Sequence, residues 1–314
     1  MFTQDTTYNS LVDLIREFPT DEACRKHLEH IRWGDSPACP HCGFTEKIYT
    51  IGGGKRYKCS ACRKIFSATS GTIFENTKVG LQKWFIAIWL CTSHKKGISS
   101  CQLARDIGIQ QKHAWHMLHR IREAFVERAP ELLEGVVETD ETFIGGKEKW
   151  KHANKRTKNN RGRSVKTKTP VFGMVERGGK TRFKVVEDTK AATLQGEIVP
   201  NVKPGSTINS DEWVGYRGLS EIYEHQVIKH KEDEYVRGTV HTNTIENRWS
   251  HFRRTLTGTY HSVSPKHLQR YADESAFRLS TFKMKEGERF DLCIAGCEGS
   301  LSYDELVGSP EWCV

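Results

Sequence analysis

The sequence predicts a multidomain α/β protein in which two small N-terminal domains precede a larger α/β domain. Three observations predict this architecture: two pairs of closely spaced cysteines near the N-terminus, helical periodicity over residues 81–125, and a strand-rich remainder after Pro130. A chain of 314 residues is too long for a single core. Its content of 37% hydrophobic and 10% aromatic residues is sufficient to bury several cores, which excludes a wholly disordered protein.

Residues 1–34 are expected to form a short helical segment. Ser10–Phe18 and Asp21–Trp33 have the periodicity of short amphipathic helices, and Pro19 separates them. The first residues lack the basic and apolar stretches of a signal peptide, and no apolar run approaches the roughly 20 residues of a membrane span. We therefore expect a soluble intracellular protein with no membrane partner.

The cysteines of residues 35–75 predict a metal site. Cys39 and Cys42 form one C-x-x-C pair, and Cys59 and Cys62 form a second pair after sixteen intervening residues that contain a hairpin with a glycine tip. Two such turns build a tetrahedral four-thiolate zinc site, which is structural because no ligand position stays open. A disulfide framework or unrelated cysteines are the alternatives, and nothing indicates secretion. His41 could in principle replace one thiolate.

Residues 76–130 have the pattern of a helix-turn-helix domain. A first helix follows Leu81, a second begins at Ser99 with a capping-box spacing to Gln102, and Gly108 makes the turn to a third helix. The early positions of the third helix, where a recognition helix contacts base edges, are polar. These candidate DNA contacts are Gln110, Gln111, Lys112, His113 and His116. The third helix also has an apolar stripe, Ala114, Leu118, Ile121 and Phe125, which a plain three-helix bundle would explain equally well.

Residues 131–283 read as an α/β domain. Strands are expected at 135–144, 170–176, 182–186, 206–209 and 223–229, and helices at 191–199, 243–256 and 265–280. This order of elements is that of a ribonuclease-H-like domain: three antiparallel strands, a helix, a strand, a connection, a further strand and then helices.

Three acids in this domain predict a second metal site. Asp140 lies in an apolar strand, where a carboxylate is costly unless a cation neutralises it, and Asp211 follows the fourth strand. Adjacent parallel strands would bring these two together, and Glu246 on the following helix supplies a third carboxylate on a face that it shares with Arg253. Three convergent carboxylates are able to hold two Mg²⁺ ions, with Mn²⁺ as a substitute, for phosphodiester chemistry.

Each acid has another interpretation. Glu246 could complete a capping box with Asn243, and Asp211 could be a turn or N-cap residue. Glu138 or Glu141 could be the ligand in place of Asp140, although Glu141 points to the opposite face of the strand.

Charge is distributed unevenly along the chain. Lys and Arg total 48 against 39 Asp and Glu, a net charge of +9, and residues 147–168 alone hold ten basic residues and one Glu. This basic insertion predicts a polyanionic partner such as nucleic acid, through Lys155, Arg156, Lys158, Arg161 and Arg163. A solvated loop is the alternative. Residues 284–314 form an acidic C-terminal tail.

Taken together, these motifs resemble the zinc-ribbon DDE transposases of bacterial insertion sequences, a group related to eukaryotic Merlin elements. The matching pieces are the two C-x-x-C pairs, Glu138-Thr-Asp-Glu-Thr142 followed by Gly145-Gly146-Lys147, Ser210-Asp211 with Tyr216, and His241-Thr-Asn-Thr-Ile-Glu246-Asn-Arg-Trp249. The resemblance covers about residues 10–280 and maps Asp140, Asp211 and Glu246 onto the catalytic triad.

That resemblance implies a DNA transposase of the bacterial cytoplasm and nucleoid. It would bind the terminal inverted repeats of its element as a homodimer or higher homo-oligomer, cleave the ends with water and join the freed 3′-OH to double-stranded target DNA. Two other functions are consistent with parts of the sequence: a non-catalytic DNA-binding regulator, and a Mg²⁺-dependent nuclease without strand transfer.

Overall fold

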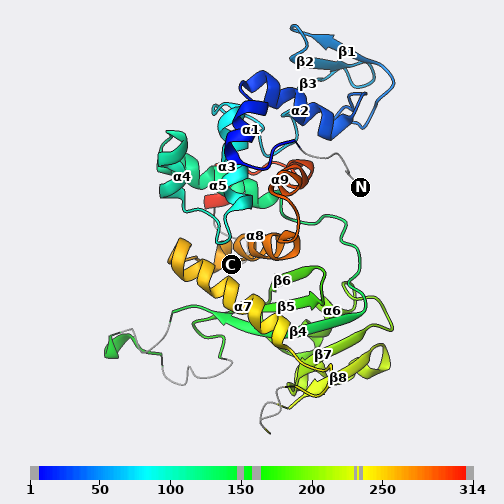
Figure 1. Ribbon diagram of the computed structural model, residues 1–314, viewed down its shortest axis with the longest axis vertical. Coiled ribbons are helices and arrows are strands. Elements are labelled where there is room, and N and C mark those ends of the chain that lie inside the picture. The colour runs from blue at the N-terminus through cyan, green and yellow to red at the C-terminus, as the bar shows by residue number, and fades with distance from the viewer. Residues whose placement is uncertain (1–6, 147–151, 158–163, 230–231, 233–235, 309–314) are drawn as a thin grey trace. The chain divides into compact units, whose positions relative to one another are not determined.

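A computed structural model describes residues 7–146, 152–157, 164–229, 232 and 236–308. The chain divides into two units (Figure 1). The first combines Met1–Glu127 with Lys283–Val314, and the second is Arg128–Phe282. The second unit is therefore an insertion between two parts of the first.

The first unit begins with two short helices and a three-stranded sheet. Their bounds are α1 Leu11–Glu17, α2 Asp21–Trp33, β1 Ile48–Ile51, β2 Arg56–Cys59 and β3 Ile65–Phe66. The strands are antiparallel in the order β1-β2-β3, and Gly52, Gly53 and Gly54 make the hairpin turn with positive φ angles that favour glycine. The sequence predicted both helices and this hairpin.

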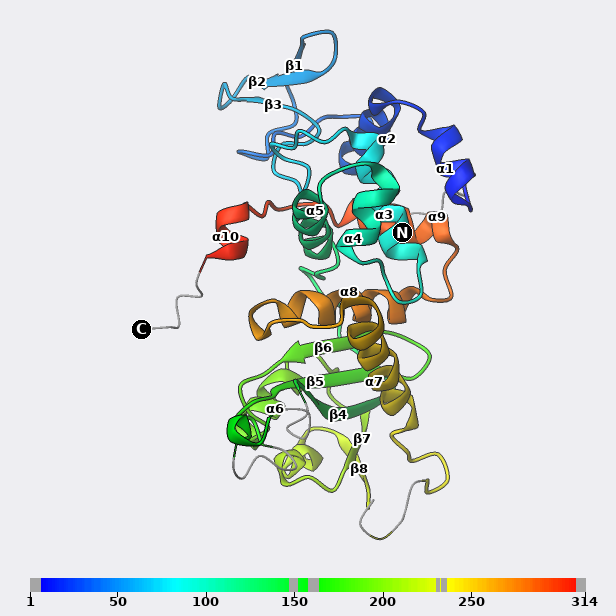
Figure 2. The same cartoon turned by 90° about the vertical axis from the view of Figure 1, so that its left-hand side faces the viewer.

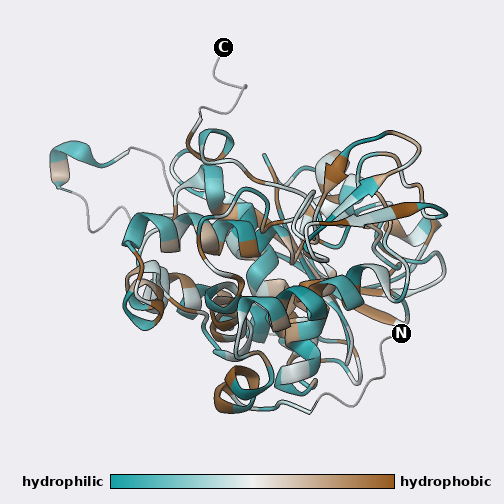
Figure 3. Cartoon of the chain, turned by 90° about the horizontal axis from the view of Figure 1, so that it is seen from above, coloured by the Kyte–Doolittle hydropathy of each residue, from teal (hydrophilic) through white to brown (hydrophobic). Residues whose placement is uncertain are grey.

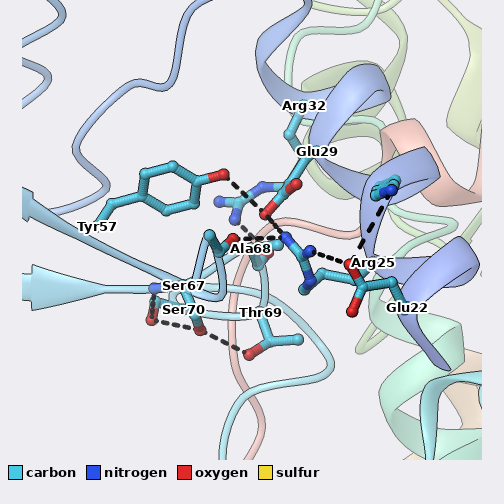
Figure 4. Close-up of polar contacts among 11 residues, drawn as sticks. Glu22, Arg25, Glu29, Arg32, Tyr57, Ser67, Ala68, Thr69 and Ser70 are labelled. Atoms are coloured by element: carbon cyan, nitrogen blue, oxygen red, sulfur yellow. Dashed lines mark hydrogen bonds and ion pairs between the residues drawn. The ribbon is translucent and has the colours of Figure 1, made fainter. Parts of the chain in front are cut away.

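Helix α2 is tied to the small sheet by polar contacts (Figure 4). The Arg25 guanidinium donates to Glu29 Oε1 at 2.5 Å and to the Gly54 carbonyl at 2.9 Å, and the Tyr57 hydroxyl donates to the same Glu29 oxygen at 3.0 Å. Arg32 donates to the Ala68 carbonyl at 2.6 Å. The ribbon and the N-terminal helices therefore pack as one body.

Three further helices of this unit match the predicted helical region: α3 Leu81–Ser93, α4 Ser100–Ile107 and α5 Gln111–Glu123. The Ser99 hydroxyl accepts the Gln102 N–H at 3.2 Å, and Gly108 is left-handed with a φ of 61°, so α4 begins and ends where the sequence indicated. The predicted apolar stripe of α5 is buried at Ala114, Leu118 and Ile121.

The acidic C-terminal segment contains two helices that the sequence did not predict, α9 Glu286–Ala295 and α10 Tyr303–Val307. Phe290 of α9 is fully buried, and its ring lies 5.2 Å from that of Phe85 on α3 and 5.9 Å from that of Tyr8. Arg289 donates to the Thr92 carbonyl at 2.9 Å. Helix α9 therefore completes the core of the first unit.

The second unit is built on a five-stranded mixed sheet, with the order β6-β5-β4-β7-β8. The strands are β4 Val136–Ile144, β5 Thr169–Glu176, β6 Thr181–Val185, β7 Thr207–Asp211 and β8 Glu224–Ile228. Strands β4, β5 and β6 pair antiparallel, whereas β7 is parallel to both β4 and β8. All five strands lie where the sequence predicted them.

Helices cover both faces of this sheet (Figures 1 and 2). Helix α6 Ala191–Ile198 buries Leu194 and Ile198 on one face, against Val137 and Ile208. Helices α7 Asn243–Thr255 and α8 Leu268–Thr281 pack on the other face, against strands β5 and β6. A π-helical stretch, Leu256–Tyr260, continues α7 beyond its predicted end. Between Asp211 and β8, the predicted connection contains the short 3₁₀ turns Val214–Tyr216 and Leu219–Glu221.

Glu138 joins β4 to the start of α7. Its side chain is fully buried, accepts the Ile245 N–H at 3.0 Å and the Thr244 hydroxyl at 2.9 Å, and pairs with the Arg177 guanidinium at 2.7 Å. A carboxylate at a helix N-terminus satisfies N–H groups that have no partner within the helix. Glu138 is thus fully engaged in structural contacts, which disfavours it as a metal ligand.

Hydrophobic and hydrophilic residues are mixed along the helices (Figure 3). Within the described part of the chain, no helix has the length and apolar character needed to cross a membrane.

The contacts of Glu138 predict a large loss of stability on its removal. Glu138→Ala leaves the Ile245 N–H and the Thr244 hydroxyl without their acceptor and the Arg177 charge without its carboxylate, so the free energy of unfolding of the second unit should fall by about 3–5 kcal/mol. Denaturant unfolding measures this change. Glu134→Ala is the control: its pair with Lys203, at 2.9 Å, is exposed, so the loss should stay below about 1 kcal/mol. Equal losses in the two variants would contradict this interpretation.

Candidate active site and metal centre

Asp140 and Asp211 lie next to each other on one face of the sheet. The parallel pairing of β4 and β7 ends at Glu138 and Asn209, and Asp140 and Asp211 follow two residues later on their strands, close enough for the Asp211 charge to raise the pKa of Asp140. Side chains alternate between faces, so Glu138, Asp140 and Asp211 share the face on which α7 packs. The juxtaposition predicted from the sequence is therefore present.

Glu141 points to the opposite face, as predicted. It is buried there and accepts a hydrogen bond of 2.5 Å from the Tyr216 hydroxyl. Burial and the nearby carboxylates of Glu141, Asp140 and Asp211 hold the pKa of Tyr216 far above its usual value, so the phenol remains a donor. Glu141 thus has a packing role beneath the candidate site.

Glu246 lies on the first turns of α7 and is exposed. The helix begins after Thr242 as its N-cap residue, so the alternative capping box between Asn243 and Glu246 is not formed. The Thr242 hydroxyl donates to Glu246 Oε1 at 3.2 Å. Glu246 precedes by about one turn Trp249, which contacts Asp140.

The three predicted carboxylates do not close into one cluster. Among the residues that the structure describes, only the four ribbon cysteines form a group of three or more potential ligands with all ligand atoms within 4.8 Å. The negative charges of the three acids repel one another, and the Glu246 carboxylate accepts a hydrogen bond from the Thr242 hydroxyl. The structure thus brings Asp140 and Asp211 together, and places Glu246 on the adjacent helix.

Asp140 occupies an environment that resists negative charge. Burial raises its pKa to about 7, and the carboxylates of Glu141 and Asp211 add to the rise, although the Glu141 N–H and the Trp249 indole favour the charged form. A bound cation would reverse this balance. The strand therefore presents a carboxylate that is expensive to ionise without a positive partner.

The four cysteine thiols Cys39, Cys42, Cys59 and Cys62 form the predicted cluster. Their sulfur atoms lie within 4.8 Å of one another, with Cys39 Sγ 3.6 Å from Cys62 Sγ and Cys42 Sγ 3.7 Å from Cys59 Sγ. A tetrahedral zinc site with zinc–sulfur bonds of about 2.3 Å has sulfur–sulfur edges of about 3.8 Å. The spacing fits zinc, and it is far too long for disulfide bonds.

The surroundings of the cluster act differently on its thiols. The Phe44 N–H favours the Cys42 thiolate, but burial and the hydrogen bonds with Cys62, Cys39 and Cys59 raise the pKa of Cys42 to about 12. Burial opposes charge on Cys59, but the N–H groups of Cys62 and Ala61 and the neighbouring thiols lower its pKa to about 7. On the inner side, Cys39 and Cys59 pack with the rings of Tyr57 and Phe66, which stack at 5.6 Å.

The candidate DNA contacts differ in accessibility. Gln110, Gln111, Lys112 and His113 are exposed at the start of α5. His116 is half-buried: its Nε2 lies 3.1 Å from the Leu301 carbonyl, and burial lowers its pKa. The Tyr303 ring lies 4.5 Å from Lys112 Nζ, so the C-terminal segment contacts this face of α5.

The basic insertion is only partly described. Lys155 and Arg156 are exposed, whereas Lys158, Arg161 and Arg163 lie outside the described residues. Arg253 is exposed on α7 and donates to the Thr142 hydroxyl.

Sequence reasoning missed one residue at the candidate site. The Trp249 indole Nε1–H donates to Asp140 Oδ2 at 3.0 Å, although the helical periodicity of residues 243–256 predicts Trp249 as part of an apolar stripe with Ile245, Phe252 and Leu256. Its position three residues after Glu246 was the available signal.

We expect Cys59→Ser to release the ribbon's zinc. Loss of one thiolate breaks a closed tetrahedral shell whose binding energy contributes to folding, so zinc content should fall and the ribbon should lose structure. Elemental analysis and circular dichroism measure both. Cys101→Ser, at an exposed free thiol of α4, should retain its zinc. A full zinc complement in Cys59→Ser would refute the four-thiolate assignment.

Asp140→Asn should stabilise the second unit in buffer without added divalent cations. The unfolded Asp ionises near pH 4 and the folded one near pH 7, so the wild type loses stability across this range as pH rises, by at most about 4 kcal/mol. Asn does not ionise, so the amount by which the melting temperature of Asp140→Asn exceeds that of the wild type should grow from pH 5 to pH 8. Calorimetry at both values tests this, and a difference that stays constant with pH would contradict it.

Comparison with known proteins identifies the family. Residues 132–280 match the family model of the ISXO2-like transposase domain, and residues 19–65 match that of the transposase zinc-ribbon domain. A relative from Halobacterium salinarum, described as an uncharacterized protein in transposable element ISH50, is 30% identical over 283 residues. The match covers 86% of this chain and 94% of the relative.

Among solved structures, the crystal structure of the Mos1 strand transfer complex is similar. The alignment covers 65% of this chain and 75% of the Mos1 chain, at 12% identity and a TM-score of 0.31. For the Mos1 transposase paired-end complex with the left transposon end, the alignment covers 63% of this chain and 73% of the Mos1 chain, at 11% identity and a TM-score of 0.27. The family matches and the relative confirm the resemblance seen in the motifs: the chain belongs to the ISXO2-like transposases and carries a transposase zinc ribbon ahead of the transposase domain.

Proposed function

We propose that this protein is a DNA transposase that binds the terminal inverted repeats of its element, cleaves the ends and joins the 3′-OH strands to target DNA. The observation that carries the proposal is the placement of Asp140 beside Asp211 on adjacent parallel strands. Both lie on the sheet face that α7 covers, and α7 carries Glu246. This arrangement supports the assignment of these three acids as a DDE triad.

The topology of the second unit supports the same chemistry. In chain order the strands are arranged 3-2-1-4-5 with the second antiparallel to the first, which is the arrangement of a ribonuclease-H-like domain. Its first and fourth strands are parallel neighbours, and they carry Asp140 and Asp211.

The donor set suits a hard divalent cation. Carboxylate oxygens are the ligands that Mg²⁺ and Mn²⁺ prefer, and the burial of Asp140 makes a cationic partner favourable. Asp140, Asp211 and Glu246 would hold two Mg²⁺ ions. When bound, these ions would supply polarisation of the scissile phosphodiester and activation of the attacking oxygen.

The protein's own groups orient the reaction. The sheet fixes the backbone of the two aspartates by pairing Asp140 with Gly173 and Asp211 with Ile228, so both side chains project from defined positions before DNA arrives. Arg253, about one turn beyond Trp249 on α7, offers a positive group near the same face for a phosphate oxygen.

DNA binding is assigned to the first unit and the basic insertion. The α4–turn–α5 pair would act as a helix-turn-helix that presents Gln110 to His113 to the major groove, beside the zinc ribbon. The basic insertion would add salt-sensitive affinity for phosphates without reading sequence. Because two element ends must be handled together, we propose a homodimer or higher homo-oligomer.

Two competing functions make different predictions in a single assay. A non-catalytic regulator would bind labelled element ends and leave them intact, and a nuclease would cut them without joining. A transposase joins the cut ends to a target plasmid in the presence of Mg²⁺. Detection of joined product would therefore separate all three functions.

Single Ala substitutions at Asp140, Asp211 and Glu246 should abolish this activity. Removal of one carboxylate breaks the shared cation site, so the rate of end cleavage should drop about 100-fold or more while DNA binding persists. Because the three act as one unit, double variants should lose little more than single ones.

The control must be an acid outside the proposed triad that takes no part in the buried Tyr216 contact beneath the site. Glu141 is unsuitable because of its buried bond to Tyr216, whereas Glu212 is a half-buried neighbour of Asp211. Glu212→Gln should therefore cleave at close to the wild-type rate. A triad variant that cleaves pre-bound DNA at the wild-type rate would exclude that residue from the triad.

A further inference from the structure

The geometry points to Trp249 as a positioning residue that fixes the Asp140 carboxylate for cation binding, with Gly173 as the residue that makes room for it. This inference rests on the proposed function, since it assigns Asp140 a divalent cation. It extends the site by an indole and a glycine, neither of which has ligand chemistry of its own.

Gly173 lies directly opposite Asp140. The antiparallel register of β4 and β5 pairs these two residues. A Cβ on Gly173 would lie 2.5 Å from Trp249 Cζ2 and 2.7 Å from Trp249 Cη2, both inside van der Waals contact. The indole therefore lies against bare backbone at this position. Because Cζ2 and Nε1 are bonded to the same ring carbon, the edge seated on Gly173 also directs the N–H toward Asp140.

The indole is held firmly in this position. It is 3% exposed, stacks on the Phe183 ring at 4.4 Å with an interplanar angle of 20°, and lies 6.3 Å from the Phe252 ring. Adjacent contacts along the same helix tie Ile245 to Glu138 and Arg253 to Thr142. A ring packed on several sides delivers its N–H in a fixed direction.

The chemistry of the contact suits a metal ligand. The indole N–H donates to Asp140 Oδ2 at 3.0 Å, and indole has no acceptor with which it could compete for a cation. A carboxylate is planar, so fixing Oδ2 also sets the direction of Oδ1. Hydrogen bonds of this kind to ligating carboxylates typically change metal affinity or activity 10- to 100-fold when they are removed.

A purely structural role would use the same contacts, so the test must measure cation binding. We would measure Mn²⁺ affinity by electron paramagnetic resonance on the full chain, with zinc in the ribbon and without DNA. Trp249→Phe keeps a ring over Gly173 and removes the N–H, and its Mn²⁺ dissociation constant should rise about tenfold or more. Asp140→Ala gives the affinity without the site.

Trp84→Phe is the matched control. Its indole is also buried and donates to a neutral hydroxyl, that of Thr77, at 2.9 Å. It should lose stability through the same loss of an indole N–H and keep wild-type Mn²⁺ affinity. If Trp249→Phe lowers the melting temperature but binds Mn²⁺ as the wild type does, the positioning role is wrong.

Gly173→Ala gives an independent second variant. The added methyl group must displace the indole, so Mn²⁺ affinity should fall although the indole N–H is still present. If both substitutions act through one hydrogen bond, the double variant should lose no more affinity than the weaker-binding single one. Additive losses would contradict a shared mechanism.

The outcome separates this inference from the proposed function. A protein that binds Mn²⁺ in a Trp249-dependent way but cleaves no element ends would refute the transposase activity and retain the positioning role. Wild-type protein whose Mn²⁺ affinity equals that of Asp140→Ala would overturn the positioning role, whatever its activity on DNA.

Discussion

Three alternate positions of strand β4, Glu138, Asp140 and Thr142, carry polar side chains beneath α7, and the second unit depends on how the helix satisfies them. Glu138 bonds to Ile245, Asp140 to Trp249, and Thr142 to Arg253. Two residues of strand advance about 6.7 Å and four residues of helix about 6.0 Å. The spacing of the three contacts is therefore nearly the same along the strand and along the helix. A slip of one residue in the sheet would turn all three polar groups into the opposite core.

This arrangement explains why acids are tolerated in a buried strand. Glu138 is compensated by Arg177 and by the N-terminus of α7, and it anchors the helix. The negative charge of Asp140 is only partly stabilised by its hydrogen bonds, so its pKa stays raised. The same strand thus contains one acid fully satisfied by the protein and, two residues later, one that is left partly unsatisfied.

The sequence predicted the parts of the molecule that depend on local patterns. Alternation and periodicity located all five strands of the second unit and its helices α6 to α8, and the C-x-x-C spacing located the metal cluster. The parallel neighbours that unite Asp140 and Asp211 followed from the order of elements. The role of Trp249 did not follow, because an apolar stripe gives no indication that one ring edge meets a carboxylate. The core position of Phe290 was missed because the surrounding acids made its segment read as a tail.

The insertion of the second unit between two parts of the first has a consequence for synthesis of the chain. Residues 128–282 are contiguous and emerge before α9, so the transposase domain is able to fold while the N-terminal unit still lacks Phe290 from its core. The rings of Tyr8, Phe18 and Phe85 gain this partner only when the segment that follows residue 282 leaves the ribosome. A nascent or prematurely terminated chain therefore carries an incomplete N-terminal unit.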